Sequence, residues 1–205
     1  MTTPAEEYKQ RHAAFLVRVA SQLEEYIRGR FDGTPHIDRV AARAKDPGRF
    51  AEKSARVDDK GNPKYKAPLT EIQDLIGARV IVFYRTDVDV AAGVVRRYFQ
   101  PIEQQQLVPE SHWEFGYFGE HFVLPLPKDV IPQDVDPAQC PSFFELQIKT
   151  LFQHAWSEAN HDLGYKAARD LKPEQLRYLA YTAAQAWGAD RVFAELDEAL
   201  SRPGD

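Results

Sequence analysis

The sequence Asp74-Leu-Ile-Gly-Ala-Arg-Val-Ile-Val-Phe-Tyr84 contains the clearest strand of the chain. From Gly77 onward it is a run of β-branched and aromatic residues, which favours a strand. After it, apolar residues at 88, 91, 92, 95 and 99 recur with helical spacing, and Thr86 is the expected N-cap of that helix. A strand followed directly by an amphipathic helix is typical of a sheet covered by helices.

The flanking sequence extends this pattern in both directions. On the N-terminal side the spacing predicts a helix at about 5–31, a strand at 38–45 and a short helix from Asp46-Pro47 to about 57. On the C-terminal side it predicts an irregular stretch at 100–120, strands at 121–126 and 142–149, and helices at about 150–166 and 173–200. The helix at 150–166 is expected to bury a stripe of Phe152, Ala155, Trp156, Ala159 and Leu163. Because strands and helices are interleaved, we expect an α/β (α+β) fold with a mixed sheet flanked by helices.

Composition excludes several classes of protein. The 205 residues are 43% hydrophobic and 28% charged, as in ordinary globular domains. The longest apolar run, 80–84, is far too short to cross a bilayer, and the first residues lack the features of a signal peptide, so no membrane partner is expected. The single cysteine, Cys140, excludes an intrachain disulfide and a cysteine-built metal site, and predicts a cytoplasmic protein.

Charge is unevenly distributed along the chain. The net charge is −5, but the segment 36–66 carries nine basic and five acidic residues. A cationic segment on an acidic body indicates a local site for an anion such as a polyphosphate. A charged helix exposed to water would give the same composition.

The last predicted strand, Phe143-Phe-Glu-Leu-Gln-Ile-Lys-Thr150, carries two different faces. Residues 144, 146 and 148 are apolar, whereas Glu145, Gln147 and Lys149 alternate with them. An anion, an amide and a cation in a row are typical of the floor of a ligand site. A half-exposed strand with its polar face in water is the alternative.

Two carboxylates are the candidates for catalysis and for binding a metal. Asp74 precedes the most apolar strand, Arg79 lies within it and needs an anionic partner, and Glu145 lies on the last strand. Asp74 and Glu145 together would suit a divalent cation such as Mg²⁺, which uses one or two carboxylates together with substrate phosphates. Asp74 would equally serve as a turn residue.

The cationic segment supplies candidates for binding phosphates. Arg43 and Lys45 are two apart on a strand, and further cations are spaced four, three and four apart as on one helix face, at Arg49, Lys53, Arg56 and Lys60. Cations near two carboxylates are typical of phosphoryl transfer, in which the protein positions the phosphates and neutralises their charge. The chain lacks the glycine-rich motif of P-loop enzymes.

Two further segments are candidates for contacts with a ligand. Phe115-Gly-Tyr-Phe-Gly-Glu-His121 places aromatic residues between glycines, so that a ring such as Tyr117 could stack on a base, although the aromatics would also fit a buried loop. The pair His154 and His161 is too weak a pattern to indicate zinc.

Taken together, the ordered blocks resemble the RelA/SpoT-type (p)ppGpp synthetase domain of the small alarmone synthetase family. The blocks are Arg-Ala-Lys-Asp-Pro-Gly-Arg-Phe-Ala-Glu-Lys (43–53), Asp-Leu-Ile-Gly-Ala-Arg (74–79), Gly-Tyr-Phe-Gly-Glu-His (116–121), Glu-Leu-Gln-Ile-Lys-Thr (145–150) and His-Ala-Trp-Ser-Glu-Ala-Asn-His-Asp-Leu-Gly-Tyr-Lys (154–166). The resemblance implies a nucleotidyltransferase-like mixed sheet and an ATP-dependent pyrophosphokinase that transfers the β,γ-pyrophosphate of ATP to the 3′-hydroxyl of GDP or GTP. It also implies an N-terminal helix at 1–35, a synthetase domain at 36–170 and a C-terminal helix at 171–205 within one domain. No hydrolase domain is expected, so the product would be made and not degraded.

The resemblance also implies roles for individual residues. The ATP phosphates would be held by Arg43, Lys45, Lys53 and Arg79, with Arg49 and Arg56 as further cations of the same face. Asp74 and Glu145 would bind magnesium, and Glu145 would also take the proton from the 3′-hydroxyl. Tyr117 would stack on the acceptor base, and contacts to the acceptor nucleotide would come from His121, Gln147 and Lys149.

The chain departs from the family pattern at several positions. Arg49 and Asp46 stand where serine is common, Asn160 stands where glutamate is usual, Lys149 replaces an arginine, and Phe118-Gly119-Glu120 replaces a sequence such as Arg-Ser-Leu. Because Glu120 would repel acceptor phosphates if it points inward, a toxic synthetase acting on the tRNA 3′ end or on adenosine nucleotides is the first alternative. A non-catalytic nucleotide-binding module is the second. A homo-oligomer or a neutralising partner protein is compatible with each of them.

Overall fold

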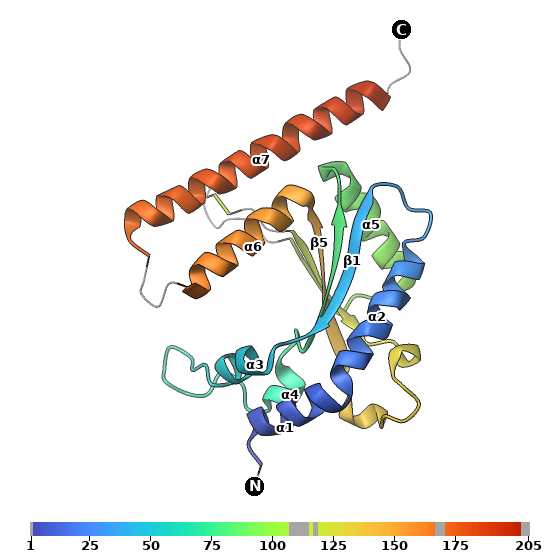
Figure 1. Cartoon of the computed structure of the whole chain (residues 1–205), viewed down its shortest axis with the longest axis vertical. Coiled ribbons are helices and arrows are strands. Elements are labelled where there is room, and N and C mark those ends of the chain that lie inside the picture. Colours follow the sequence, from blue (N-terminus) through green and yellow to red (C-terminus); the bar gives the residue numbers. More distant parts are fainter. Residues whose placement is uncertain (1, 107–114, 117–118, 167–170, 202–205) are drawn as a thin grey trace.

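A five-stranded mixed sheet forms the centre of the molecule in the computed structural model, which describes residues 2–106, 115–116, 119–166 and 171–201 (Figure 1). The strands are β1 Ile37–Ala44, β2 Ile76–Val82, β3 Glu103–Gln106, β4 Glu120–Pro125 and β5 Phe143–Thr150. Their order across the sheet is β1-β2-β5-β4-β3; β2 and β5 are parallel and the other neighbours are antiparallel. The predicted mixed α+β fold is therefore confirmed.

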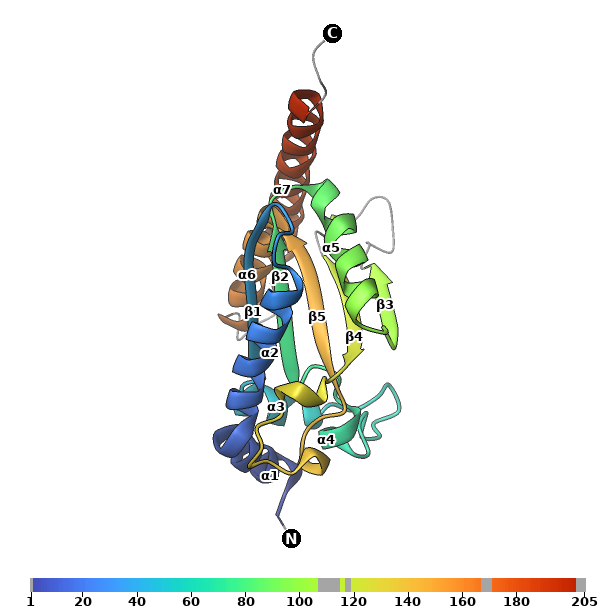
Figure 2. The same ribbon diagram turned by 90° about the vertical axis from the view of Figure 1, so that its right-hand side faces the viewer.

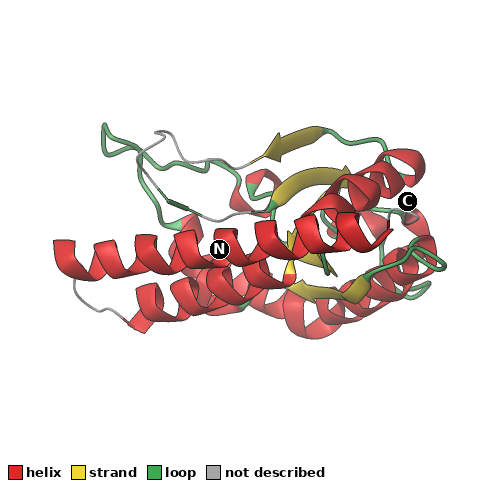
Figure 3. Ribbon diagram, turned by 90° about the horizontal axis from the view of Figure 1, so that it is seen from above, coloured by secondary structure: helices red, strands yellow, loops and turns green. Residues whose placement is uncertain are grey.

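Helices cover both faces of this sheet. They are α1 Pro4–Arg11, α2 Val17–Arg30, α3 Pro47–Ser54, α4 Pro68–Glu71, α5 Arg85–Tyr98, α6 Leu151–Lys166 and α7 Pro173–Ser201, and a π-helical turn at His12–Leu16 joins α1 to α2. α2 and α5 pack on one face, whereas α6 lies over the other face and is itself covered by α7 (Figures 1 and 2). Seen from above, α6 and α7 run side by side beyond the sheet (Figure 3). Within the described part of the chain, no helix combines the length and the apolar character needed to cross a bilayer.

The hydrophobic core lies between the sheet and the helices α2 and α5. Its sheet side includes Phe144, Leu146 and Ile148, which are fully buried, and its helix side includes Leu23 and Ile27. The apolar face of β5 is therefore the one predicted from its alternation, because successive side chains of a strand point to opposite faces. The polar face of β5 is left on the side of α3 and α6.

Local sequence signals set several element boundaries as expected. Asp46 caps α3, its side chain accepting a hydrogen bond of 3.1 Å from the backbone N–H of Arg49, and Pro47 is the first helical residue. Gly33 adopts a φ of +74°, in the left-handed region open to glycine, just after the end of α2.

Three expectations about local structure were wrong. Thr86 is not the N-cap of α5: the helix begins at Arg85, and the Asp87 side chain accepts from the backbone N–H of Tyr84 at 2.9 Å. The stretch at 100–120 contains the strand β3, which is short and entirely polar and so gives no alternation signal. In α6 the expected apolar stripe is not a core stripe, because Ala155, Ala159 and Leu163 are exposed. α6 lies above a polar cavity and not on the core.

Gly119 is a position where the fold tolerates no side chain. A Cβ there would lie 2.1 Å from the carbonyl oxygen of Ile148 and 2.6 Å from Cγ of Lys149. The carbonyl belongs to the central strand β5, so it cannot move without disturbing the β-ladder. This close approach gives a physical reason for the glycine in the Phe118-Gly119-Glu120 departure.

Replacing Gly119 by alanine should lower the free energy of unfolding by about 1–3 kcal/mol or more, as overpacking does elsewhere. The matched control is Gly93→Ala in the exposed interior of α5, where a Cβ meets nothing within 4 Å. Alanine there should raise stability by about 0.5–1 kcal/mol through its better helix propensity. Urea unfolding of both variants measures the contrast. Equal stability of Gly119→Ala and the parent protein would show that the Gly119 backbone can shift freely.

Candidate active site

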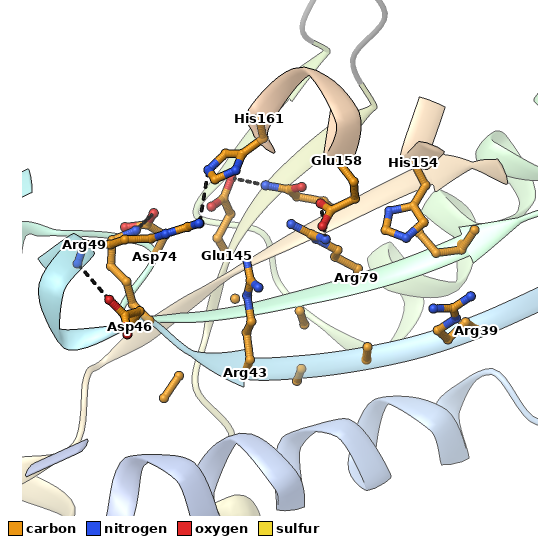
Figure 4. Close-up of a pocket in the computed structure, with 18 of the residues that line it drawn as sticks. Arg39, Arg43, Asp46, Arg49, Asp74, Arg79, Glu145, His154, Glu158 and His161 are labelled. Carbon is orange, nitrogen blue, oxygen red and sulfur yellow. Dashed lines mark hydrogen bonds and ion pairs between the residues drawn. The ribbon is translucent and has the colours of Figure 1, made fainter. Parts of the chain in front are cut away.

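A cavity of about 790 Å³ lies between the polar face of the sheet and α6 (Figure 4). It is lined from β1, β2 and β5 below, from α3 at one end and from α6 above. Its charged lining residues are Arg39, Arg43, Lys45, Asp46, Arg49, Asp74, Arg79, Glu145 and Glu158. The cavity is large enough for a nucleotide, and its five cations suit an anionic one.

The ladder pairing explains why residues from distant segments share this cavity. Arg43 of β1 pairs with Gly77 of β2, and Gly77 pairs with Glu145 of β5. Residues opposite one another in a ladder present their side chains on the same face. Gly77 has no side chain, and nothing lies within 4 Å of where its Cβ would be, so the floor between Arg43 and Glu145 is open.

Most of the cations predicted to bind phosphates line the large cavity, but one lines a smaller cavity and one lies outside both. Arg43, Lys45, Arg49 and Arg79 line the large cavity, whereas Lys53 lines a smaller neighbouring cavity. Burial, together with the charge of Arg79, lowers the pKa of Arg43, which reflects the density of positive charge here. Arg56 lines neither of these cavities: α3 ends at Ser54, so the helical spacing that grouped Arg56 with Arg49 and Lys53 stops before it.

Asp74 is held by two lysines from the cationic segment. Lys45 Nζ donates to Asp74 Oδ2 at 2.6 Å, and Lys53 Nζ donates to Oδ1 at 3.0 Å. Burial opposes ionisation of Asp74, but the hydrogen bonds and charges of both lysines outweigh it and lower the pKa of this carboxyl. Asp74 is therefore ionised at neutral pH.

Glu145 is the second carboxylate of the site. His121 Nδ1 lies 2.8 Å from Glu145 Oε1, and Gln147 Nε2 donates to the same oxygen at 3.1 Å. Burial opposes its ionisation too, but His121 and Gln147 outweigh it and lower the pKa. His121 Nε2 and Gln147 Oε1 are buried and have no hydrogen-bond partner among the described residues, so both are available to a ligand.

A second cavity of about 120 Å³ meets the first at these two carboxylates. It is lined by Lys53, Gln73, Asp74, Glu103, Gln105, His121, Phe122, Val123 and Glu145. Asp74 and Glu145 line both cavities. The two acidic residues that the sequence singled out, 71 positions apart in the chain, thus mark the boundary between the two cavities.

The remaining predicted acceptor residues differ in their placement. Tyr117 lies outside the described residues. Lys149 is on the same face of β5 as Glu145, but it is 5% exposed and lines neither of these cavities. Its Nζ donates to Ser157 Oγ of α6 at 3.0 Å, which ties β5 to α6 beside the large cavity.

Lys149 should give the protein a distinctive dependence of stability on pH. Burial and the charge of Arg79 lower the pKa of Lys149 to about 8. The pKa of a lysine in the unfolded chain is about 10.4, roughly two units higher. Between these values the unfolded chain binds more protons than the folded one, so this residue makes stability rise with pH.

The expected result is that the parent protein gains stability relative to Lys149→Met as pH rises from about 8 to about 10. Urea unfolding across this range measures the difference. The control is Lys128→Met, an exposed position that should follow the parent at every pH. Parallel curves for the parent and Lys149→Met would contradict the lowered pKa.

Several cavity residues were missed by sequence reasoning. Glu158 accepts from Arg79 Nη1 at 2.6 Å, and His161 Nε2 lies 3.1 Å from Arg49 Nη1, so α6 contacts both sides of the cavity (Figure 4). Burial and the charge of Arg49 lower the pKa of His161, so its neutral ring accepts from that arginine. His154 and His161 both line the cavity, and their seven-residue spacing, considered above only for zinc, was the signal that could have found them.

Tyr8 is a second feature that periodicity did not reveal. It fits the apolar stripe of the first helix, but its hydroxyl donates to the backbone carbonyls of Lys45 at 2.8 Å and Leu75 at 3.2 Å. Its ring stacks on Phe50 of α3 with centroids 4.1 Å apart. Tyr8 therefore fixes the two backbone segments that carry Lys45 and Asp74.

The carboxylates of Asp74 and Glu145 fit a hard divalent cation whose other ligands come from a substrate. Asp74 and Glu145 are both ionised and border the same space, and oxygen ligands of this kind suit magnesium. Among the described residues, no group of three or more His, Cys, Asp or Glu side chains could hold a metal by itself. Phosphate oxygens of a substrate would have to complete the coordination.

The chain thus combines a five-stranded mixed sheet with two cavities that meet at a pair of carboxylates. The family described as "Region found in RelA / SpoT proteins" matches residues 42–170, and this chain belongs to that family. The match includes both carboxylates and most of the residues that line the two cavities.

Individual relatives agree with this assignment. The GTP pyrophosphokinase YjbM of Bacillus subtilis (strain 168) is 26% identical over 164 residues, which cover 79% of this chain and 71% of YjbM. Small alarmone synthetase 1 of Bacillus subtilis, solved with its product pppGpp, has a TM-score of 0.75 at 20% identity, covering 96% of this chain and 100% of that one. A GTP pyrophosphokinase family protein from Streptococcus pneumoniae has a TM-score of 0.74 at 23% identity, covering 98% and 96%. The two structural similarities concern the fold.

Proposed function

We propose that this protein is a GTP/GDP 3′-pyrophosphokinase. It transfers the β,γ-pyrophosphate of ATP to the 3′-hydroxyl of GDP or GTP, and so forms the alarmone (p)ppGpp and AMP. Membership of the RelA/SpoT family and the similarity to the pyrophosphokinase YjbM support this reaction. We also propose that residues 36–170 form the catalytic part of one domain, which the segments 1–35 and 171–205 complete.

The observation that carries the proposal is the meeting of two unlike cavities at Asp74 and Glu145. The larger cavity is rich in arginine and lysine, and the smaller is rich in carboxylates. A transfer between two substrates needs the donor and the acceptor to approach from two sides of the same catalytic groups. This arrangement supports a bisubstrate reaction over a non-catalytic nucleotide-binding module.

On the donor side, ATP would occupy the large cavity. Arg43, Lys45, Arg49 and Arg79 line it and would neutralise the triphosphate, with Lys53 beside Asp74 reaching the phosphates at the boundary. Arg56 is not part of this proposal, because it lies beyond the end of α3. Positioning and neutralisation of charge are the main contributions of a protein to phosphoryl transfer.

Glu145 would act as the general base. The ionised carboxylate takes the proton of the acceptor 3′-hydroxyl while that oxygen forms a bond to the β-phosphorus of ATP. The bond between the β-phosphorus and the oxygen bridging to the α-phosphorus breaks, and AMP leaves with that electron pair. The lowered pKa of Glu145 keeps it in the ionised form that a base requires.

Asp74 and Glu145 would hold the divalent cation, proposed here as Mg²⁺. When bound, the ion would neutralise the charge that develops on the transferred phosphates. In its absence Lys45 and Lys53 balance the charge of Asp74.

On the acceptor side, His121 is proposed to contact the acceptor nucleotide from the smaller cavity. Gln147 lines the large cavity beside Glu145 and is proposed to reach the acceptor at the boundary between the two cavities. Their unpartnered buried atoms, Nε2 and Oε1, support this role. Stacking of Tyr117 on the acceptor base stays a prediction. Glu120 belongs to the opposite face of β4 from His121, where Gln104 donates to it, so it does not face the acceptor cavity. This removes a reason to prefer an acceptor other than GDP or GTP.

An acceptor panel tests the proposed function. The protein is incubated with ATP labelled in its γ-phosphate, magnesium, and in turn GDP, GTP, ADP, ATP alone or tRNA. Label should appear on the 3′-position of GDP or GTP. Preferential labelling of tRNA or an adenosine nucleotide would reassign the acceptor, and no transfer to any of them would leave only a nucleotide-binding module.

A further inference from the structure

The smaller cavity has a chemistry of its own. Three carboxylates, from Asp74, Glu103 and Glu145, line it against the single lysine Lys53. A volume of about 120 Å³ accommodates one ring and not a whole nucleotide. Because a polyphosphate would be repelled by these carboxylates, the cavity favours the uncharged, hydrogen-bond-donating part of a ligand.

Two glutamine side chains hold Glu103, which lines the smaller cavity together with Glu145. Gln73 Nε2 donates to Glu103 Oε2 at 3.2 Å, and Gln105 Nε2 donates to Glu103 Oε1. Each carboxylate oxygen can accept more than one hydrogen bond, so both oxygens keep acceptor capacity. The two amides therefore orient Glu103 without saturating it.

The ladder pairing puts Glu103 in one row with the proposed general base. Glu103 of β3 pairs with Val123 of β4, and Val123 pairs with Glu145 of β5. All three side chains therefore lie on the same face, with buried Val123 as the apolar floor between two carboxylates. Two strand spacings of about 4.8 Å separate the two glutamates along this row.

This spacing fits a vicinal diol. The two hydroxyls of a diol, each donating one hydrogen bond of about 2.7 Å to a carboxylate on its own side, would span the space above Val123. Both hydroxyls would donate, and carboxylates are pure acceptors. A ribose has such a diol at its 2′ and 3′ positions.

We infer that the smaller cavity receives the ribose of the acceptor nucleotide, with the 3′-hydroxyl at Glu145 and the 2′-hydroxyl bound by Glu103. This rests on the proposed function, and it deepens it by making Glu103 a specificity-determining residue. The acceptor enters with its hydroxyl edge first, and its phosphates stay outside the carboxylate-lined space. The protein should therefore select ribonucleotides over 2′-deoxyribonucleotides.

The test compares GDP with 2′-deoxy-GDP as acceptors. For the parent protein, kcat/KM should be at least about tenfold higher with GDP, a difference of about 1.4 kcal/mol. In Glu103→Ala, kcat/KM for GDP should fall by about this factor while that for 2′-deoxy-GDP changes little, so that the ratio approaches one. The KM for ATP should not change, because Glu103 does not line the large cavity. Glu103→Gln, which keeps the shape and one oxygen acceptor, should give an intermediate ratio.

The matched control is Gln104→Ala. Gln104 is the next residue on β3 and contacts Glu120 on the opposite face, so its loss should leave the GDP to 2′-deoxy-GDP ratio unchanged. Equal loss of activity with both acceptors in Glu103→Ala, or an unchanged ratio in both Glu103 variants, would overturn the inference. In either case the proposed pyrophosphokinase activity would stand, since the parent protein would still transfer label.

Equilibrium binding separates this inference from the proposed function. GDP and 2′-deoxy-GDP are titrated into the parent protein and into Glu103→Ala without ATP. Tighter binding of GDP that disappears in the variant would support the ribose site even if no acceptor were labelled. Equal affinities of the parent protein for both nucleotides would overturn it.

Discussion

Glu145→Gln should reduce pyrophosphate transfer by about 100- to 1,000-fold while leaving the fold intact. The amide cannot take the proton of the 3′-hydroxyl, and it brings no negative charge to a bound cation. It keeps an oxygen in the position that now accepts from His121 and Gln147, so the local hydrogen bonds can survive. Single-turnover rates with saturating ATP and GDP measure the chemical step, and thermal denaturation verifies folding.

The control for this substitution is Glu120→Gln. Glu120 lies on the neighbouring strand β4 but on the opposite face, where Gln104 donates to it. Its amide variant should transfer at close to the parent rate. Near-normal turnover of Glu145→Gln would refute both the base and the metal role of Glu145.

Asp74→Asn should also lower transfer by about 100-fold or more, because a fixed charge at the reacting centre is lost. In addition it leaves Lys45 and Lys53, which donate to Asp74 at 2.6 and 3.0 Å, facing each other without a counter-charge. The two effects differ in their response to metal: loss of a metal ligand raises the magnesium concentration needed for half-maximal rate. Initial rates over a magnesium titration therefore measure both.

Asp134→Asn provides the comparison for Asp74→Asn. Asp134 is paired with Arg18 on the surface, and both side chains are largely exposed. Because exposed ion pairs contribute little to stability, this variant should keep the parent rate and magnesium requirement. If Asp74→Asn lost activity with an unchanged magnesium requirement, Asp74 would be a partner of the lysines only.

Most of the secondary structure could be predicted because its signals are local. The alternation of Phe144, Leu146 and Ile148 with polar residues identified both faces of β5, and Asp46-Pro47 identified the start of α3. β3 was missed because Glu103-Gln-Gln-Gln106 has no apolar face, and it forms by pairing with β4. The stripe of α6 was misassigned because helical periodicity does not tell a core from the roof of a cavity.

The candidate site was predictable in its chemistry but not in its arrangement. Asp74, Glu145 and the cations of 43–53 were found from residue type and local spacing. Arg56 was wrongly grouped with them because its spacing assumed a helix that ends at Ser54. Glu103, Glu158 and Tyr8 were not found, since nothing in their neighbourhood in the sequence distinguishes them from surface or core residues.

The sequence by itself therefore determined most of the strands and helices, together with Asp74, Glu145 and the cations of 43–53, because these depend on neighbours a few positions apart. Only the tertiary structure decided that Arg43, Gly77, Glu145, Val123 and Glu103 form one row across five strands. That row arises from the strand order and from ladder registers between segments that are far apart in the chain. In this row Glu145 lies between the cationic large cavity and the carboxylate-lined smaller cavity. No pattern of neighbouring residues in the sequence predicts this arrangement.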